Sequence, residues 1–277
     1  MFDEFYAMYE STEHEVLALM GRCVGCSFVT QSRCVAPDVL MIGALFCDSG
    51  QLVKRAMHLH WPLFDKDLPN AKVYKRFAVG QVCRLKIRKL KDEFACDQHI
   101  PRYCLRQVIS TYEQCPELMP LLEEYHKEVL LQDDILGTLK LDKDFEKFRG
   151  QLNCCKSAVA LSIDVDAFAQ ESWTKTLNAA KPLVIDCISW DGQMRKYAAH
   201  KLSETYNDAH AHGCDDGDYE ELSEEYFANK LTLLKLEISS DVSFKAYFDC
   251  DDIFFNSFVT VTGSVQCGFE AANVEER

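Results

Sequence analysis

LGTLKLDKDFEKFRGQLNCCKSAVALSIDV, residues 136–165, holds the pattern that decides the fold of the second half of the chain. Apolar and polar residues alternate through it in three short runs, most strictly at Val159, Leu161, Ile163 and Val165. Period 2 is the spacing of a strand with one face on a core and the other in water. Residues 142–144 and 153–157 separate the runs and have turn composition. We therefore predict three antiparallel strands here.

The rest of the second half predicts three helices and then three more strands. Helix signals occur at 166–180, where Pro182 then interrupts, at 189–206 and at 223–230. Alternation returns at 234–238, 242–248 and 259–265. The prediction is an α+β fold: an antiparallel sheet in the order βββ-ααα-βββ, with the helices packed on one face.

The first half gives more mixed signals. The recurrence of Phe2, Phe5, Tyr6 and Tyr9 at helical steps predicts a helix over the first twenty residues. Strands are predicted at 39–47, 51–59 and 73–90, with Gly80 as a turn or bulge. An apolar stripe that begins at Pro116 predicts a helix to about residue 132.

Charge divides the chain into two parts. Its 277 residues carry a formal net charge of −14, but residues 1–133 hold 16 Lys and Arg against 18 Asp and Glu, and residues 134–277 hold 14 against 26. We therefore expect two domains, 1–133 and 134–277, the second strongly acidic. Such acidity argues against nucleic acid as the partner of the second domain, because phosphate contacts need cations.

The N-terminus and the longest apolar run indicate the cellular location that we expect. The N-terminus is acidic where a secretory signal would be basic, and the longest apolar run, 39–47, is too short to cross a bilayer. We expect a cytoplasmic protein with no membrane partner.

The second half also resembles a known family. The segment from Leu136 to about Gly268 is similar to the bacterial domain-of-unknown-function family numbered 2262, which is uncharacterised. The similarity rests on the order and spacing of LGTLKLDKDFEKFRGQL (136–152), LSIDVD (161–166), WDGQMRKYAAHKL (190–202), LTLLKLEI (231–238) and FKAYFDCDDIFFNSFVTVTGSV (244–265). The resemblance implies a bacterial origin and a domain boundary, but no activity. Residues 1–133 are not assigned to a family.

Cysteines supply the first candidate chemistry. Cys23 and Cys26 form a C-x-x-C pair, Cys34 follows, and Cys96 or His99 could complete a zinc or iron–sulfur site. A second C-x-x-C is missing, and the chain has fourteen cysteines, so one such pair arises readily by chance. Reduced thiols in small apolar sites are the favoured interpretation, with no metal and no cofactor.

Acidic turns supply the second candidate chemistry. Paired carboxylates can act as acid and base when their environments separate their pKa values, but in a hairpin turn they are more often simply turn residues. The candidates for partner binding are Asp215, Asp216, Asp218, Asp249, Asp251 and Asp252.

A basic stretch supplies the third candidate for a function. Residues 72–91 hold eight Lys and Arg and no acid, with Arg84, Lys86 and Arg88 on one strand face. A strip for phosphate backbones is one interpretation. A charged edge strand, or a strip facing the acidic half of the protein, is the favoured one.

The sequence contains no set of residues that defines a reaction. We expect a non-enzymatic protein-binding module, immunity-like or regulatory, whose partner is a basic protein. The alternatives are a metal-dependent protein or hydrolase-like enzyme using Cys23, Cys26 and Cys34 or the turn at 249–252, and a nucleic-acid binder using residues 72–91.

Overall fold

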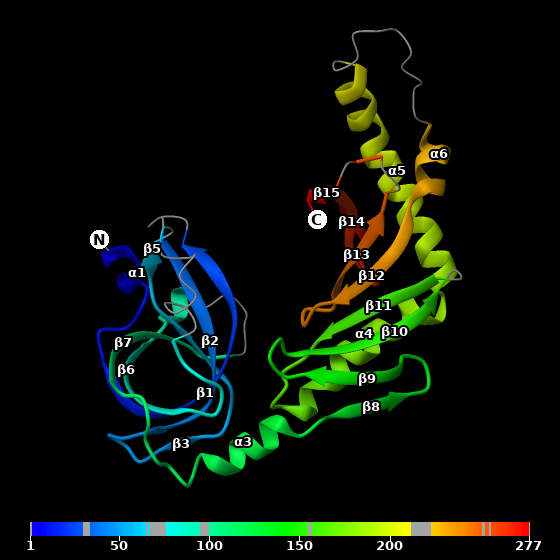
Figure 1. Ribbon diagram of the computed structural model, residues 1–277. Helices are drawn as coiled ribbons and strands as arrows, with labels where there is room; N and C mark the ends of the chain where they lie inside the picture. The colour runs from blue at the N-terminus through cyan, green and yellow to red at the C-terminus, as the bar shows by residue number, and fades with distance from the viewer. Residues whose placement is uncertain are drawn as a thin grey trace. The chain divides into compact units, whose positions relative to one another are not determined.

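The computed structural model describes residues 2–29, 34–64, 66, 76–94, 100–154, 157–211, 223–250, 253–254 and 256–276. Strands account for 48% of the structure and helices for about 25%, which places the fold in the α+β or mainly β class. The chain divides into two compact units, the first coloured from blue to the green of α3 and the second from green to red in Figure 1. Unit 1 comprises residues 1–127 with 143–145, and unit 2 comprises residues 128–142 with 146–277.

Unit 1 is built on a seven-stranded sheet that closes on itself. The sheet runs β1-β6-β7-β4-β2-β3, β5 pairs with β2, and a further β1–β2 pairing closes the ring into a small barrel. Its elements are α1 (Asp3–Ala7), β1 (His14–Val29), β2 (Cys34–Phe46), β3 (Leu52–Val53), β4 (Met57–His60), β5 (Leu63–Phe64), β6 (Val82–Lys89), η2 (Asp92–Phe94), β7 (Arg102–Ser110) and α3 (Met119–His126).

Alternate residues of this sheet enter different clusters. Val39 and Met41 of β2 pack with Met57 and Leu59 of β4 in the main core of the unit. Residues of the opposite parity, such as Cys34 and Ala36 of β2 and Cys104 of β7, pack with Phe5 and Tyr9. The segment that contains α1 therefore covers the second face of β2 and β7, and both faces of these strands are buried.

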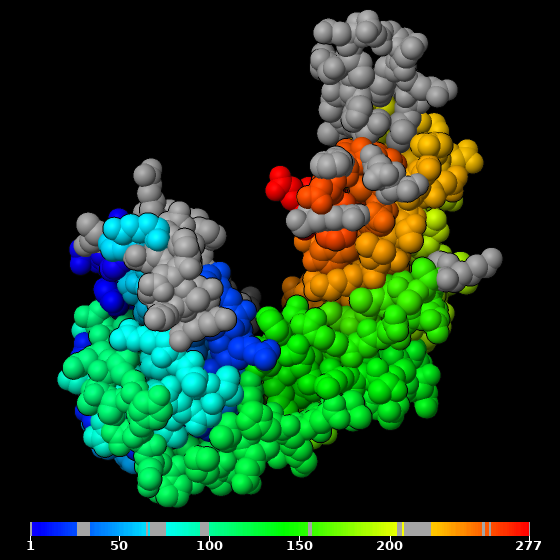
Figure 2. All heavy atoms as spheres, in the orientation of Figure 1, coloured from blue at the N-terminus to red at the C-terminus, as the bar shows by residue number. Residues whose placement is uncertain are grey.

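Unit 2 contains an eight-stranded sheet in the order β15-β14-β13-β12-β11-β10-β9-β8. Its elements are β8 (Leu130–Asp133), β9 (Gly137–Asp142), β10 (Lys147–Cys154), β11 (Ser157–Asp164), η3 (Gln170–Ser172), α4 (Trp173–Ile185), α5 (Cys187–Ala211), α6 (Glu224–Lys230), β12 (Thr232–Ile238), β13 (Ser243–Asp249), β14 (Ser257–Ser264) and β15 (Gly268–Glu276). The sheet is antiparallel except where β11 pairs with β12. Figure 2 shows the described atoms of unit 2 coloured from green through gold and orange to red.

Two helices cover one face of this sheet. Phe148, Ile163, Ile238 and Phe244 are partners in register on neighbouring strands, so they share that face. Phe148 meets Trp173 of α4 edge to face, with ring centroids 4.8 Å apart, and Phe244 meets Trp190 of α5 at 6.0 Å. Figure 1 shows α4 and α5 along the same side of the strands. The buried residues of helices and sheet form one core cluster.

The helix expected over the first twenty residues is wrong. α1 ends at Ala7, and residues 14–29 form β1. Val16, Ala18 and Met20 enter the main core of unit 1, whereas Leu17 and Leu19 pack in another cluster. Because both faces of β1 are buried, its apolar residues form a continuous run instead of an alternation.

Two further expected elements of unit 1 also differ. α3 ends at His126, and residues 130–133 leave the expected helix to pair as β8 with β9. The strand expected at 51–59 is divided into β3 and β4. Gly80 has a φ of +80° and precedes β6, which places it in a turn.

In unit 2, strands β9, β10 and β11 occupy the 136–165 segment. The sheet has one strand more at each end than the βββ-ααα-βββ pattern contains, namely β8 and β15. Pro182 does not interrupt α4, which continues to Ile185. The third helix begins as expected, with the Ser223 hydroxyl accepting from the Tyr226 amide at 3.2 Å.

Candidate metal centre

The register of strands β2, β4 and β7 gathers three potential metal ligands in unit 1. Asp38 of β2 lies opposite His60 of β4, and Leu40 lies opposite His58. His58 and His60 are two residues apart on one strand, so their side chains leave the same face, and directly paired residues share that face as well. The local fold therefore brings one carboxylate and two imidazoles together.

The geometry of the three side chains is compact. Their potential ligand atoms all lie within 4.8 Å of one another. Nδ1 of His58 donates a hydrogen bond to Oδ1 of Asp38, and the same Oδ1 lies 3.9 Å from Nε2 of His60. The two imidazole rings are stacked, with centroids 6.2 Å apart. Ligands about 2.1 Å from one ion lie roughly 3–3.5 Å from each other, so small side-chain rotations suffice to place all three on one ion.

His60 is the unusual member of this group. The residue is only 4% exposed, and its Nε2 is buried without a hydrogen-bond partner in the described part of the chain. Burial lowers the pKa of His60 to about 4, so the imidazole is neutral at pH 7 and carries a free lone pair. An unsatisfied buried polar atom costs about 1–3 kcal/mol, which a ligand at this position would recover.

Asp38 is held in its ionised form. Burial opposes the charge, but the hydrogen bond from His58 and the nearby His60 and Arg102 outweigh it and lower the pKa of the carboxyl below its usual range. Arg102 lies opposite His58 in the parallel β4–β7 pair. The site thus holds a charged carboxylate and a neutral imidazole at neutral pH, which are the protonation states that bind metal.

Other polar groups beside the cluster keep their protons. Burial raises the pKa of Tyr9 well above its ordinary value, and burial raises the pKa of the Cys104 thiol to about 11. Without a metal ion, both groups are therefore protonated at neutral pH. The potential ligand atoms that lie within 4.8 Å of one another belong to Asp38, His58 and His60.

Two histidines and one carboxylate have a definite chemistry. This set binds zinc in hydrolytic sites and ferrous iron in oxygen-using sites, and in both it leaves coordination positions open for water or substrate. Closed structural sites use four protein ligands. The three-ligand arrangement in unit 1 is of the open kind.

The expected cysteine site is not assembled among the residues that the structure describes. In that part of the chain the three potential ligands that lie together are Asp38, His58 and His60, and the group includes none of Cys23, Cys26 and Cys34. Burial raises the pKa of Cys26 above its ordinary value, so it is a thiol and not a thiolate at neutral pH. Cys96 and His99 lie outside the described residues.

Most of the acidic partner-binding candidates also fall outside the described residues, namely Asp215, Asp216, Asp218, Asp251 and Asp252. Asp249 is the last residue of β13 and lies half-buried beside Lys230 and Thr232, at a shallow hollow in unit 2.

The basic strip is in contact with glutamates of its own unit. Arg84 pairs with Glu15 at 3.0 Å, and Arg88 pairs with Glu13 at 2.7 Å. β6 lies between β1 and β7, so the expectation of an edge strand is wrong. The charges of these arginines are therefore largely neutralised by Glu13 and Glu15.

Sequence reasoning missed Asp38, His58 and His60. The signal was a His-Leu-His step at the end of an expected strand and an aspartate one residue before another. Each feature is common by itself. Only the antiparallel pairing of β2 with β4 brings them together, and that pairing is not visible in the sequence.

Comparisons with known proteins give families and no activity. A family model described as "Uncharacterized protein conserved in bacteria (DUF2262)" matches residues 133–274, and one described as "Domain of unknown function (DUF7021)" matches residues 1–125. No curated protein and no solved structure matches the chain. None of the described helices has the length and apolar character needed to span a membrane.

Proposed function

The chain belongs to the bacterial family whose model matches residues 133–274 (DUF2262), and we propose that it is a cytoplasmic metal-dependent protein. Unit 1 holds one divalent ion of the zinc or ferrous class through Asp38, His58 and His60. The observation that carries this proposal is the buried Nε2 of His60, which lacks a partner among the described residues and lies 3.9 Å from the Asp38 carboxylate.

Nδ1 of His58, Nε2 of His60 and the Asp38 carboxylate would hold the ion. His58 would then be the neutral tautomer that carries its proton on Nε2 instead of on Nδ1, where it is hydrogen-bonded to Asp38. The ion would also give the buried Nε2 of His60 a partner. Bound there, it would supply Lewis-acid chemistry.

Thermal unfolding tests the proposal. Adding Zn²⁺ to chelator-treated protein should raise the melting temperature, because a ligand bound only by the folded state stabilises it. His60→Gln should abolish that shift. His126→Gln is the matched control, since His126 is exposed at the end of α3 and outside the cluster. An equal shift in all three proteins would show that Zn²⁺ acts elsewhere.

A second candidate function is protein binding by unit 2, in an immunity-like or regulatory role. The observation that favours it is the excess of 26 Asp and Glu over 14 Lys and Arg in residues 134–277. Such a charge steers a basic partner and raises its association rate. In this proposal Asp249 and the acidic residues around it form the rim of the contact.

Association kinetics test this second candidate. With a basic protein captured from the source cell, Asp249→Lys and added salt should both slow association and leave dissociation nearly unchanged, because rim charges act on encounter. A captured partner whose association rate is unchanged by Asp249→Lys and by added salt would show that the acidic charge does not steer binding.

A further inference from the structure

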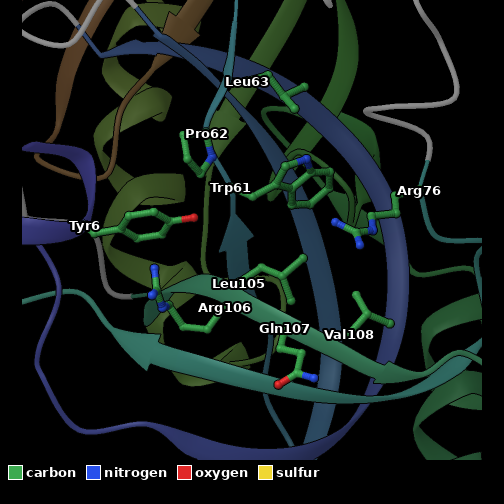
Figure 3. Close-up of a pocket in the computed structure, with 9 residues that line it drawn as sticks. All are labelled: Tyr6, Trp61, Pro62, Leu63, Arg76, Leu105, Arg106, Gln107 and Val108. Carbon is green, nitrogen blue, oxygen red and sulfur yellow. The ribbon is translucent and has the colours of Figure 1, made fainter. Parts of the chain in front are cut away.

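A cavity in unit 1 lies next to the strand that carries the two histidines. Its volume is about 330 Å³, at the lower end of the range of roughly 300–1,000 Å³ for small-molecule pockets. Residues 61–63, which follow His60, form one wall, and residues 105–108 of β7 form another. Figure 3 shows Tyr6 and Arg76 closing two further sides.

The polar side chains of this cavity are rich in donors. Arg76 and Arg106 contribute guanidinium groups, Trp61 an indole N–H, Tyr6 a phenol and Gln107 an amide, while no carboxylate is among the described residues that line the cavity. Burial raises the pKa of Tyr6 above its ordinary value although Arg106 acts in the opposite direction, so its hydroxyl keeps a proton to donate. A cavity with this lining favours a ligand that accepts hydrogen bonds and carries negative charge.

The two arginines are weakly neutralised. The Glu13 carboxylate lies 2.7 Å from Arg88 but 3.5 Å from Arg106. The Arg106 guanidinium instead lies 4.0 Å from the centre of the Tyr6 ring, which fixes its plane. Arg76 makes no ion pair with the described residues. Positive charge therefore remains available to a ligand.

Trp61 gives an independent indication of a ligand. It is 4% exposed, and its Nε1 is buried without a partner among the described residues. Buried indole N–H groups normally find an acceptor. Figure 3 shows the Trp61 ring on the cavity wall between Leu63 and Arg76. Trp61 and Arg76 thus line the same cavity.

We infer that this cavity binds a small organic anion, a carboxylate or phosphate group joined to an apolar body. The anionic group accepts hydrogen bonds from the guanidinium groups of Arg76 and Arg106 and from the indole N–H of Trp61. The apolar body contacts the rings of Tyr6 and Trp61 and the side chains of Leu63 and Leu105. This inference does not depend on the metal at Asp38.

Calorimetric titration of the full chain tests the inference. The probes are phenyl phosphate and benzoate, with benzyl alcohol as the neutral analogue, in buffer containing a chelator so that no metal contributes. One of the two anions should bind, and benzyl alcohol should not. The preferred anion identifies the head group, since phosphate and carboxylate present different numbers of acceptors to the two arginines.

Variants locate the binding. Arg76→Gln with Arg106→Gln should weaken the preferred anion about tenfold or more, because each charge-assisted contact contributes strongly. Trp61→Phe should weaken it less and keep the preference. Arg22→Gln is the matched control, since its side chain is 62% exposed and does not line the cavity.

Three results would overturn the inference. The first is the absence of binding heat with both anions at millimolar concentration. The second is binding of the preferred anion by the double arginine variant as tightly as by the wild type. The third is binding of inorganic phosphate as tightly as the preferred anion, which would show that the cavity recognises no apolar body.

Discussion

Asp38 and His60 lie directly opposite each other in the antiparallel pair β2–β4, with Oδ1 of the carboxylate 3.9 Å from Nε2 of the imidazole. They are too far apart for a hydrogen bond. His58, two residues before His60, makes the hydrogen bond to the same oxygen. This leaves a buried nitrogen that faces a carboxylate without contacting it, a spacing that one metal ion fits.

Unit 2 is expected to fold by itself if its first strand is kept. β8 pairs with β9 from Leu130 to Asp133, and Leu131 packs on the core of the unit. A fragment of residues 128–277 should unfold cooperatively, and one of residues 134–277 should melt about 5 °C lower or more, because it lacks that strand. Differential scanning calorimetry of the two fragments measures this. Equal melting temperatures would show that β8 adds nothing.

Gly263 in β14 should tolerate no side chain. A Cβ there would collide with the carbonyl oxygen of Gly268 and lie 3.0 Å from its carbon, and both atoms belong to the backbone. Gly263→Ala should therefore lower the free energy of unfolding by about 2 kcal/mol or more. Gly192→Ala in α5 is the control, since nothing lies within 4 Å of a Cβ there. That control should raise the free energy by roughly 0.5–1 kcal/mol. Urea unfolding that gave both variants the same sign would contradict the β14–β15 contact.

Asp133 should make stability depend on acid. Its carboxylate accepts from the Ile135 and Leu136 amides at 2.9 and 3.0 Å and pairs with Lys181 at 2.9 Å. The Leu136 amide, helped by Lys181, lowers the pKa of Asp133 below its ordinary value. A lowered folded-state pKa adds stability above the unfolded value, about 3.9, that is lost as pH falls through the folded one.

Asp133→Ala should therefore cost about 1–2 kcal/mol at pH 7, and the difference from wild type should shrink below about pH 4. Asp134→Ala, at the exposed neighbour, is the control and should cost little. Urea unfolding at several pH values measures both. A difference that stays constant down to pH 2 would show that the charge of Asp133 contributes nothing.

The sequence predicts those strands of this fold that have one solvent-exposed face. Val159, Leu161 and Ile163 are apolar and buried, whereas Ala158 and Ala160 between them are small and exposed, and this period is visible in the sequence. β1 has no such period, since Leu17 and Leu19 pack in one cluster and Val16 and Ala18 in another. A strand buried on both sides looks locally like a helix.

The candidate metal ligands could not be predicted from the sequence, for a different reason. His58 and His60 share a face in any strand, and that much is readable from their spacing. Asp38 joins them only because β2 pairs with β4 in one register, and a shift by one residue would turn the carboxylate to the other face. The candidate site depends on a long-range pairing that leaves no local pattern. The C-x-x-C pair has a local pattern, but its cysteines are not gathered into a ligand group within the described residues.

Metal content tests the central claim most directly. The purified chain is loaded with Zn²⁺ or, without oxygen, with Fe²⁺, dialysed, and analysed by plasma mass spectrometry beside His60→Gln, His126→Gln and Cys26→Ser. The account predicts about one ion per chain in the wild type and in the His126 and Cys26 variants, and almost none in the His60 variant. A wild type without bound metal, a His60 variant that retains the full ion, or a loss confined to Cys26→Ser would contradict it.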